Sequence, residues 1–148
     1  MSKKAVLVTG GFDPIHKGHI EYLRDAKKLG DILYVGLNSD HWLTRKKGKP
    51  FMDLENRAMV IQSLDMVDEV IIFNDEDNSS CHAIHQTLQF YDEVIFANGG
   101  DRLLSNIPEY EKYKNDKRVK FVFNVGGDKT ESSSWLLDEW KSPKTLRK

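Results

Sequence analysis

The chain has 148 residues, of which 39% are hydrophobic, so a single globular domain can bury a core without disulfides or metals. Its 22 basic and 23 acidic residues give a net charge of −1, which excludes a global field that would draw the protein to nucleic acid or anionic lipid. A single cysteine, Cys81, excludes an internal disulfide framework and agrees with a reducing compartment. No apolar run approaches the roughly 18 residues that a membrane helix needs, so we expect a cytoplasmic protein with no membrane or nucleic-acid partner.

Short apolar runs alternate with amphipathic stretches from the first residues onward. Residues 4–9 predict a buried strand, residues 18–29 a helix that Gly30 ends, and residues 32–37 a second strand. Such a strand-helix-strand unit crosses over right-handed and pairs its strands in parallel. The alternation continues with helices expected at 54–64, 83–90 and 108–114, strands at 69–73, 93–97 and 119–125, and a last helix starting at 132–134.

This order predicts an α/β fold, a three-layer open parallel sheet of about five strands with helices on both faces. We expect one domain over residues 1–140, followed by a basic tail over 141–148. In such sheets, ligands lie beyond the carboxyl ends of the strands. The loops that follow strands are therefore the candidate site.

The first of these loops, residues 10–19, reads Gly-Gly-Phe-Asp-Pro-Ile-His-Lys-Gly-His and is called the HxGH loop below. Gly10 and Gly11 let the backbone turn tightly and approach a phosphate closely. His16 and His19 are three residues apart, so both can face one side of a helix start, where negative charge is favoured; Gly18 keeps the surface between them open. Two imidazoles there can stabilise charge that grows on a phosphate during phosphoryl or nucleotidyl transfer.

The alternative for this loop is an ordinary turn with two exposed histidines. From the composition of the chain, His-x-Gly-His is expected by chance roughly 0.01 times. Its place after a first strand and at a helix start further favours a phosphate site.

A basic cluster at residues 45–49, Arg-Lys-Lys-Gly-Lys, follows the second strand and a short helical stretch. A basic run alone is typical of a solvated loop, but at this edge of the sheet lysines suit a polyphosphate. Arg57, in Glu-Asn-Arg, is either an exposed helix residue or a phosphate-binding residue whose guanidinium donates paired hydrogen bonds.

Two more segments follow strands or start helices. Residues 98–101, Asn-Gly-Gly-Asp, form either a generic turn or a loop that approaches a ligand closely. Ser132, Ser133 and Ser134 can cap a helix, bind phosphate, or do both.

Two further patterns are rejected. Residues 126–130 suggest a Walker loop, but Asp128 stands where the glycine before the lysine is required. Cys81, His82 and His85, with His16, His19 and His41, suggest zinc, yet the first three lie in an ordinary amphipathic helix and no second cysteine exists.

The HxGH loop and five other motifs together resemble the cytidylyltransferase-like nucleotidyltransferase superfamily. The motifs are Leu-Gly-Asp at 29–31, Gly-Leu-Asn-Ser-Asp at 36–40, Glu-Asn-Arg at 55–57, Asn-Gly-Gly-Asp at 98–101 and Ser-Ser-Ser at 132–134. The resemblance covers residues 4–138 and implies a Rossmann-like fold. It also implies a reaction in which a substrate phosphate attacks the α-phosphorus of an NTP and releases pyrophosphate, with Mg²⁺ on the NTP phosphates and no metal ligand from protein side chains.

The resemblance also implies roles for single residues. The implied catalytic residues are His16, His19 and Lys46. The implied nucleotide- and phosphate-binding residues are Gly10, Gly11, Phe12, Lys17, Gly18, Asn98, Gly99, Asp101, Lys129, Thr130, Ser132, Ser133 and Ser134. The implied substrate-binding residues are Asp13, Asp40, Lys47, Lys49 and Arg57. The chain departs from its relatives at Asn98, where many have lysine, and at Lys129, where glycerol-phosphate enzymes have arginine.

The partners expected are an NTP and a phosphorylated small molecule, and the family commonly forms homodimers. The resemblance divides between glycerol-3-phosphate cytidylyltransferase and the adenylyltransferase domain that activates heptose 1-phosphate, so the base, CTP or ATP, stays open. Outside this class, a non-catalytic nucleotide- or zinc-binding regulator is the alternative, against which the intact His16, His19, Lys46 and Arg57 argue.

Overall fold

The computed structural model describes residues 3–99, 107–126 and 133–141. Its centre is an all-parallel sheet of five strands in the order β3-β2-β1-β4-β5. The strands are β1 (Lys4–Gly10), β2 (Ile32–Leu37), β3 (Glu69–Ile72), β4 (Glu93–Ala97) and β5 (Val119–Val122). The strand order reverses between β1 and β4, which confirms the α/β, Rossmann-like prediction and puts the switch point beside the HxGH loop.

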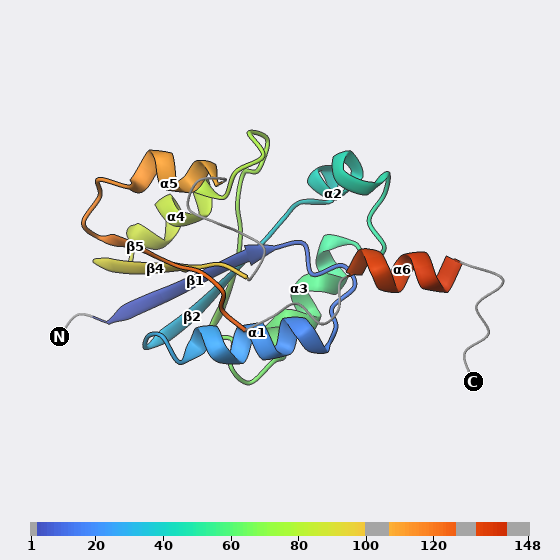
Figure 1. Cartoon of the computed structure of the whole chain (residues 1–148), viewed down its shortest axis with the longest axis horizontal. Coiled ribbons are helices and arrows are strands. Elements are labelled where there is room, and N and C mark those ends of the chain that lie inside the picture. Colours follow the sequence, from blue (N-terminus) through green and yellow to red (C-terminus); the bar gives the residue numbers. More distant parts are fainter. Residues whose placement is uncertain (1–2, 100–106, 127–132, 142–148) are drawn as a thin grey trace.

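Helices cover both faces of the sheet (Figure 1). They are α1 (Lys17–Lys27), α2 (Asp40–Lys47), α3 (Leu54–Gln62), α4 (Cys81–Leu88), α5 (Pro108–Tyr113) and α6 (Ser133–Lys141). In Figure 1, α1 and α3 lie below the sheet, α4 and α5 lie above it, and α2 and α6 lie beyond the carboxyl ends of the strands. Within the described ranges, no helix is both long and apolar enough to cross a bilayer.

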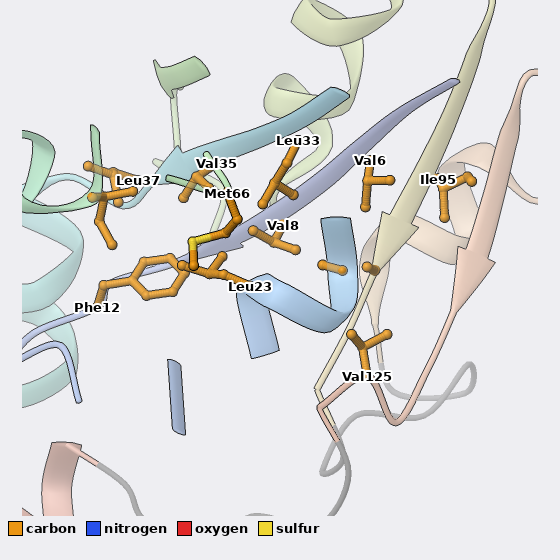
Figure 2. Close-up of a cluster of buried hydrophobic side chains, with 13 residues drawn as sticks. Val6, Val8, Phe12, Leu23, Leu33, Val35, Leu37, Met66, Ile95 and Val125 are labelled. Atoms are coloured by element: carbon orange, nitrogen blue, oxygen red, sulfur yellow. The ribbon is translucent and has the colours of Figure 1, made fainter. Parts of the chain in front are cut away.

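Each face of the sheet has its own apolar cluster. Alternation along β1 sends Val6 and Val8 toward the cluster under α1 and α3, and Leu7 toward the cluster under α4 and α5. Figure 2 shows the first cluster, with the ring of Phe12 turned toward its side chains. Since the middle of β1 is buried on both faces, residues 5–8 are an uninterrupted apolar run. Each large, fully buried apolar side chain contributes about 1.5–3 kcal/mol.

Two boundaries differ from the expected ones for local reasons. β5 ends at Val122 instead of residue 125, because beyond its last partner the chain turns around Asn98, which donates to Val122 O and accepts from Val125 N. The basic residues 45–47 form the last turn of α2, which ends at Gly48 with φ 92°. Such a left-handed residue commonly stops a helix, so only the end of the basic cluster is a loop.

Candidate active site

The HxGH loop connects β1 to α1 at the switch point of the sheet. His16 is the N-cap of α1: its Nδ1 accepts from Gly18 N at 3.1 Å, while His19 Nδ1 accepts from His16 N at 3.2 Å. These two bonds form a capping box in which imidazoles replace the usual serine and glutamate. In a neutral imidazole whose Nδ1 accepts, the proton is on Nε2, so each ring has an Nε2–H donor.

The two imidazoles lie face to face, as their spacing predicts. Their ring centroids are 3.9 Å apart with an interplanar angle of 26°, and the ring of Phe12 lies at 62° to that of His19 with centroids 4.9 Å apart. A Cβ at Gly18 would lie 2.9 Å from His16 Cε1, so glycine is required for the two rings to keep this arrangement. The start of α1 therefore presents two histidine donors together, with exposed Lys17 beside them.

The glycine pair allows close packing within the protein. A Cβ at Gly11 would lie 2.9 Å from Leu43 Cδ2, and one at Gly10 would lie 3.2 Å from the ring of Phe12. Phe12 itself is buried and has φ 52°, a conformation that is unusual for an aromatic residue. The loop is thus held tightly between the core and α2.

Asp13 of the HxGH loop forms an ion pair with Lys47 of α2. The Asp13 carboxylate accepts from Phe51 N at 2.7 Å and Met52 N at 2.5 Å, and it lies 2.8 Å from Lys47 Nζ, which also donates to the Asp13 carbonyl at 2.6 Å. Because Asp13 is only 3% exposed, these contacts stabilise the folded conformation of the loop. Of the two substrate-binding lysine candidates, Lys47 lies in this cluster and Lys49 is exposed.

Arg57 of α3 is buried at the centre of the same edge. Its guanidinium donates to three carbonyl oxygens and to the carboxylate of Asp40, and its side chain is 0% exposed. The acceptors are Met52 O at 3.0 Å, Gly11 O at 3.1 Å, Asn38 O at 2.7 Å and Asp40 Oδ1 at 2.7 Å. The guanidinium thereby joins the HxGH loop to the start of α2 and the chain before α3.

Lys46 lies in the last turn of α2, next to the Lys47 that pairs with Asp13. Its Nζ is 5.0 Å from the centroid of the Trp42 ring, a distance typical of a cation–π contact. The sequence predicted Lys46 as a site residue but not Trp42, although a separation of four residues on a helix indicates that they are neighbours.

Asp75, in the β3–α4 connection, is a buried carboxylate that sequence reasoning missed. It accepts from Asn38 Nδ2 at 3.1 Å, from Ser39 N at 2.8 Å and from Ser39 Oγ at 2.8 Å. Burial alone raises the pKa of Asp75, but these hydrogen bonds outweigh it and hold the pKa below 3.8. The signal that could have identified Asp75 is its position shortly after the third strand, at the edge of the sheet where ligands bind.

Of the Asn-Gly-Gly-Asp segment at 98–101, which follows β4, the structure describes residues 98 and 99. Asn98 is 2% exposed, and its side-chain amide donates to Phe96 O at 3.2 Å and Val122 O at 3.5 Å. A Cβ at Gly99 would meet nothing within 4 Å. Ser133 begins α6 and Ser134 follows it, whereas Asp101, Lys129, Thr130 and Ser132 lie outside the described residues.

The zinc pattern was tested against the same geometry. Among the described residues, no group of three or more His, Cys, Asp or Glu is arranged to hold a metal ion. Cys81 is buried, burial raises the pKa of its thiol, and His82 Nδ1 accepts from Asn74 N at 2.7 Å.

The parallel sheet with two stacked histidines at its switch point agrees with the nucleotidyltransferase class that the motifs predict. The family model described as cytidylyltransferase-like matches residues 7–146, and the chain belongs to this family.

Curated relatives are similar over most of the chain. The bifunctional protein HldE of Helicobacter pylori strain HPAG1 is 47% identical over 121 residues, which is 80% of this chain and 25% of that protein. HldE of Geobacter sulfurreducens is 34% identical over 131 residues, 86% of this chain and 26% of that protein. The chain therefore spans about a quarter of the length of the curated relatives it matches.

Solved structures share the fold. A lipopolysaccharide core biosynthesis protein from Thermoplasma volcanium GSS1 is 30% identical with a TM-score of 0.65, covering 82% of this chain and 95% of that one. A putative nicotinate-nucleotide adenylyltransferase from Vibrio parahaemolyticus, 15% identical with a TM-score of 0.63 over 92% of this chain and 85% of that one, shows the fold alone.

Proposed function

We propose that the chain transfers a nucleoside monophosphate from an NTP to a sugar or polyol phosphate, with release of pyrophosphate. The observation that carries this proposal is the stacked pair His16 and His19 at the start of α1, with Lys46 and Lys47 supplied by α2. Two donors and the ammonium of Lys46 at one sheet edge, with Lys47 beside them in its pair with Asp13, suit a reaction that needs positioning and charge stabilisation and no covalent intermediate.

In the proposed reaction, an oxygen of the acceptor phosphate attacks the α-phosphorus, and the bond from that phosphorus to the bridging oxygen of pyrophosphate breaks. The Nε2–H groups of His16 and His19 donate to phosphate oxygens as charge moves onto the leaving group. The amino-terminal end of α1 adds its partial positive charge. Lys46 binds phosphate oxygens as a point charge, and Lys17 and Lys49 are proposed as further cations around the site.

Asp13, Asp40 and Arg57, for which the resemblance implies contact with the acceptor substrate, are proposed to act also by holding the HxGH loop and α2 in place. Gly10, Gly11 and Phe12 are proposed to offer backbone amides. Asn98 and Gly99, with Asp101, are proposed to meet the base and ribose. Lys129, Thr130 and the serines that lead into α6 are proposed to bind the triphosphate.

Mg²⁺ is proposed to arrive on the NTP phosphates, where it neutralises charge. The carboxylate of Asp13 accepts two backbone amides and pairs with Lys47, which supports a role for it in the fold and a metal held by phosphate oxygens. Phosphate oxygens are the hard ligands that Mg²⁺ prefers, with few ligands from protein.

The relatives favour one of the two acceptor branches. Both HldE proteins, and the lipopolysaccharide core biosynthesis protein, support a sugar phosphate over glycerol 3-phosphate. We therefore propose heptose 1-phosphate with ATP as the first pair to test, and glycerol 3-phosphate with CTP as the second. Use of an NTP agrees with a cytoplasmic location.

The test is pyrophosphate release, measured with Mg²⁺, each of the four NTPs and a panel of sugar and polyol phosphates. We expect release above background with ATP and heptose 1-phosphate, and with no acceptor only slow hydrolysis. No release with any pair would refute the enzymatic proposal and favour a non-catalytic nucleotide-binding regulator, which nucleotide titration by calorimetry would then detect.

A homodimer is proposed as the assembly. Two large aromatic side chains are exposed side by side, Phe51 at 55% and Trp140 at 76%, with ring centroids 6.4 Å apart. Such a patch supports a protein contact. Sedimentation equilibrium at several concentrations is the measurement, and a monomer throughout the range contradicts the proposal.

A further inference from the structure

Trp42 lies in the wall of the candidate site next to the HxGH loop. Its ring atom Cζ3 lies 3.8 Å from the position of a Cβ at Gly11, so the indole borders the glycine turn directly. The next residue, Leu43, is 2% exposed and packs on the same glycine, which fixes the face that α2 turns toward the loop. The backbone amide of Trp42 is held by the N-cap Ser39 at 3.0 Å.

The two lysines of α2 are held by different means. Lys47 Nζ pairs with the Asp13 carboxylate at 2.8 Å, whereas Lys46 Nζ lies 5.0 Å from the centroid of the Trp42 ring. A carboxylate adds an opposing unit charge, but an aromatic face attracts a cation without neutralising it. The ring of Trp42 thus contacts the Lys46 ammonium without adding a charge to it.

We infer that Trp42 is a positioning residue that holds the Lys46 ammonium on the indole that borders Gly11, for a substrate phosphate. The inference rests on the proposed function, because it assigns a use to the phosphate site. A free lysine side chain has several rotatable bonds, and ordering it on binding costs affinity. The indole restrains Lys46 before substrate arrives, at the i, i+4 separation that a helix provides.

Three variants separate this role from simple packing: Trp42→Leu, which keeps an apolar side chain but removes the aromatic face, Trp42→Phe, which keeps a smaller face, and Lys46→Met. A cation–π contact at an exposed site is worth about a two- to fivefold change in an equilibrium constant. We expect Trp42→Leu to raise the KM of one phosphorylated substrate by about this factor, with kcat less affected, and Trp42→Phe to restore most of it.

The double variant decides whether the effect acts through Lys46. In the Lys46→Met background, Trp42→Leu should change KM no further, because its partner is already gone. An equal rise in KM in both backgrounds, an unchanged or lower KM in Trp42→Leu, or a Trp42→Phe that is as impaired as Trp42→Leu would each overturn the inference.

Binding of inorganic tripolyphosphate, measured by calorimetry, gives the same comparison without turnover. The affinity should fall about two- to fivefold in Trp42→Leu and be unchanged by Trp42→Leu in the Lys46→Met background. If the wild type releases no pyrophosphate with any substrate pair, the proposed function fails, and the tripolyphosphate affinities alone decide the role of Trp42. If the wild type is active and both comparisons show no dependence on Trp42, only this inference fails.

Discussion

The hydroxyl of Ser39 lies between the backbone amide of Trp42 and the carboxylate of Asp75. It accepts from Trp42 N at 3.0 Å and donates to Asp75 Oδ1 at 2.8 Å, so one carboxylate fixes the N-cap of α2. Arg45, further along the helix, donates to the Asp75 carbonyl at 2.9 Å. The β3–α4 connection thus holds the helix that carries Lys46 and Lys47.

Replacing Asp75 with asparagine should destabilise the protein by about 1–3 kcal/mol at neutral pH, because an NH₂ group replaces an oxygen that accepts from buried donors. The pKa of Asp75 lies below 3.8 in the folded protein. The stability that its charge contributes is therefore present above pH 3.8 and is lost as the pH falls through the folded pKa. Urea unfolding at several pH values should show the difference between wild type and Asp75→Asn shrinking in acid.

The matched control for this experiment is Asp25→Asn, which removes an exposed carboxylate 3.4 Å from Lys28. Its effect on the free energy of unfolding should stay within about 0.5 kcal/mol. A difference between wild type and Asp75→Asn that stays constant from neutral pH to acid would show that the Asp75 charge does not stabilise the fold.

His16 has two separable duties, since Nδ1 caps α1 and Nε2 is proposed to bind a phosphate. Asparagine is a preferred N-cap, so His16→Asn should unfold within about 0.5 kcal/mol of the wild type, while His16→Ala should lose about 1 kcal/mol. Both should lower the rate of pyrophosphate release by about 10²- to 10³-fold, the cost of one transition-state donor. Full turnover in His16→Asn would assign the histidine to capping alone.

The alternation of strands and helices could be predicted because both faces of the sheet are buried. The central strands β1, β2 and β4 then contain short apolar runs, and the helices between the strands show their own periodicity. The pairing of His16 with His19 was equally accessible, since residues three apart at a helix start are neighbours whatever the rest of the fold does.

The network around Arg57 could not be predicted in the same way. Motif resemblance supplied the identity of Asp13, Asp40 and Arg57 as site residues. It did not reveal that the guanidinium is fully buried on three carbonyl groups and Asp40, because those acceptors come together only in the folded chain. Asp75 was missed for the same reason, since its partners are 36 and 37 residues away.

Arg57→Lys should destabilise the protein by about 3 kcal/mol, because one ammonium cannot reach all the carbonyl groups that the guanidinium satisfies. The control is Arg118→Lys, which changes an exposed ion pair with Asp116 and should leave the free energy of unfolding close to that of the wild type. Chemical unfolding measures both. If Arg57→Lys is as stable as the wild type but has a raised KM for NTP, the guanidinium acts on substrate phosphate instead of on the fold.

Gly11→Ala tests the contact between the HxGH loop and α2. The new Cβ would lie 2.9 Å from Leu43 Cδ2, a buried side chain, so α2 must shift at a cost of about 1–3 kcal/mol, and Lys46 shifts with it. Leu43→Ala removes the obstructing methyl groups, and Gly11→Ala should therefore cost less in that background than alone. Gly99→Ala is the control for stability, because its Cβ would meet nothing within 4 Å. Equal unfolding free energies for Gly11→Ala and Gly99→Ala would show that the loop accommodates a side chain at residue 11 without displacing α2.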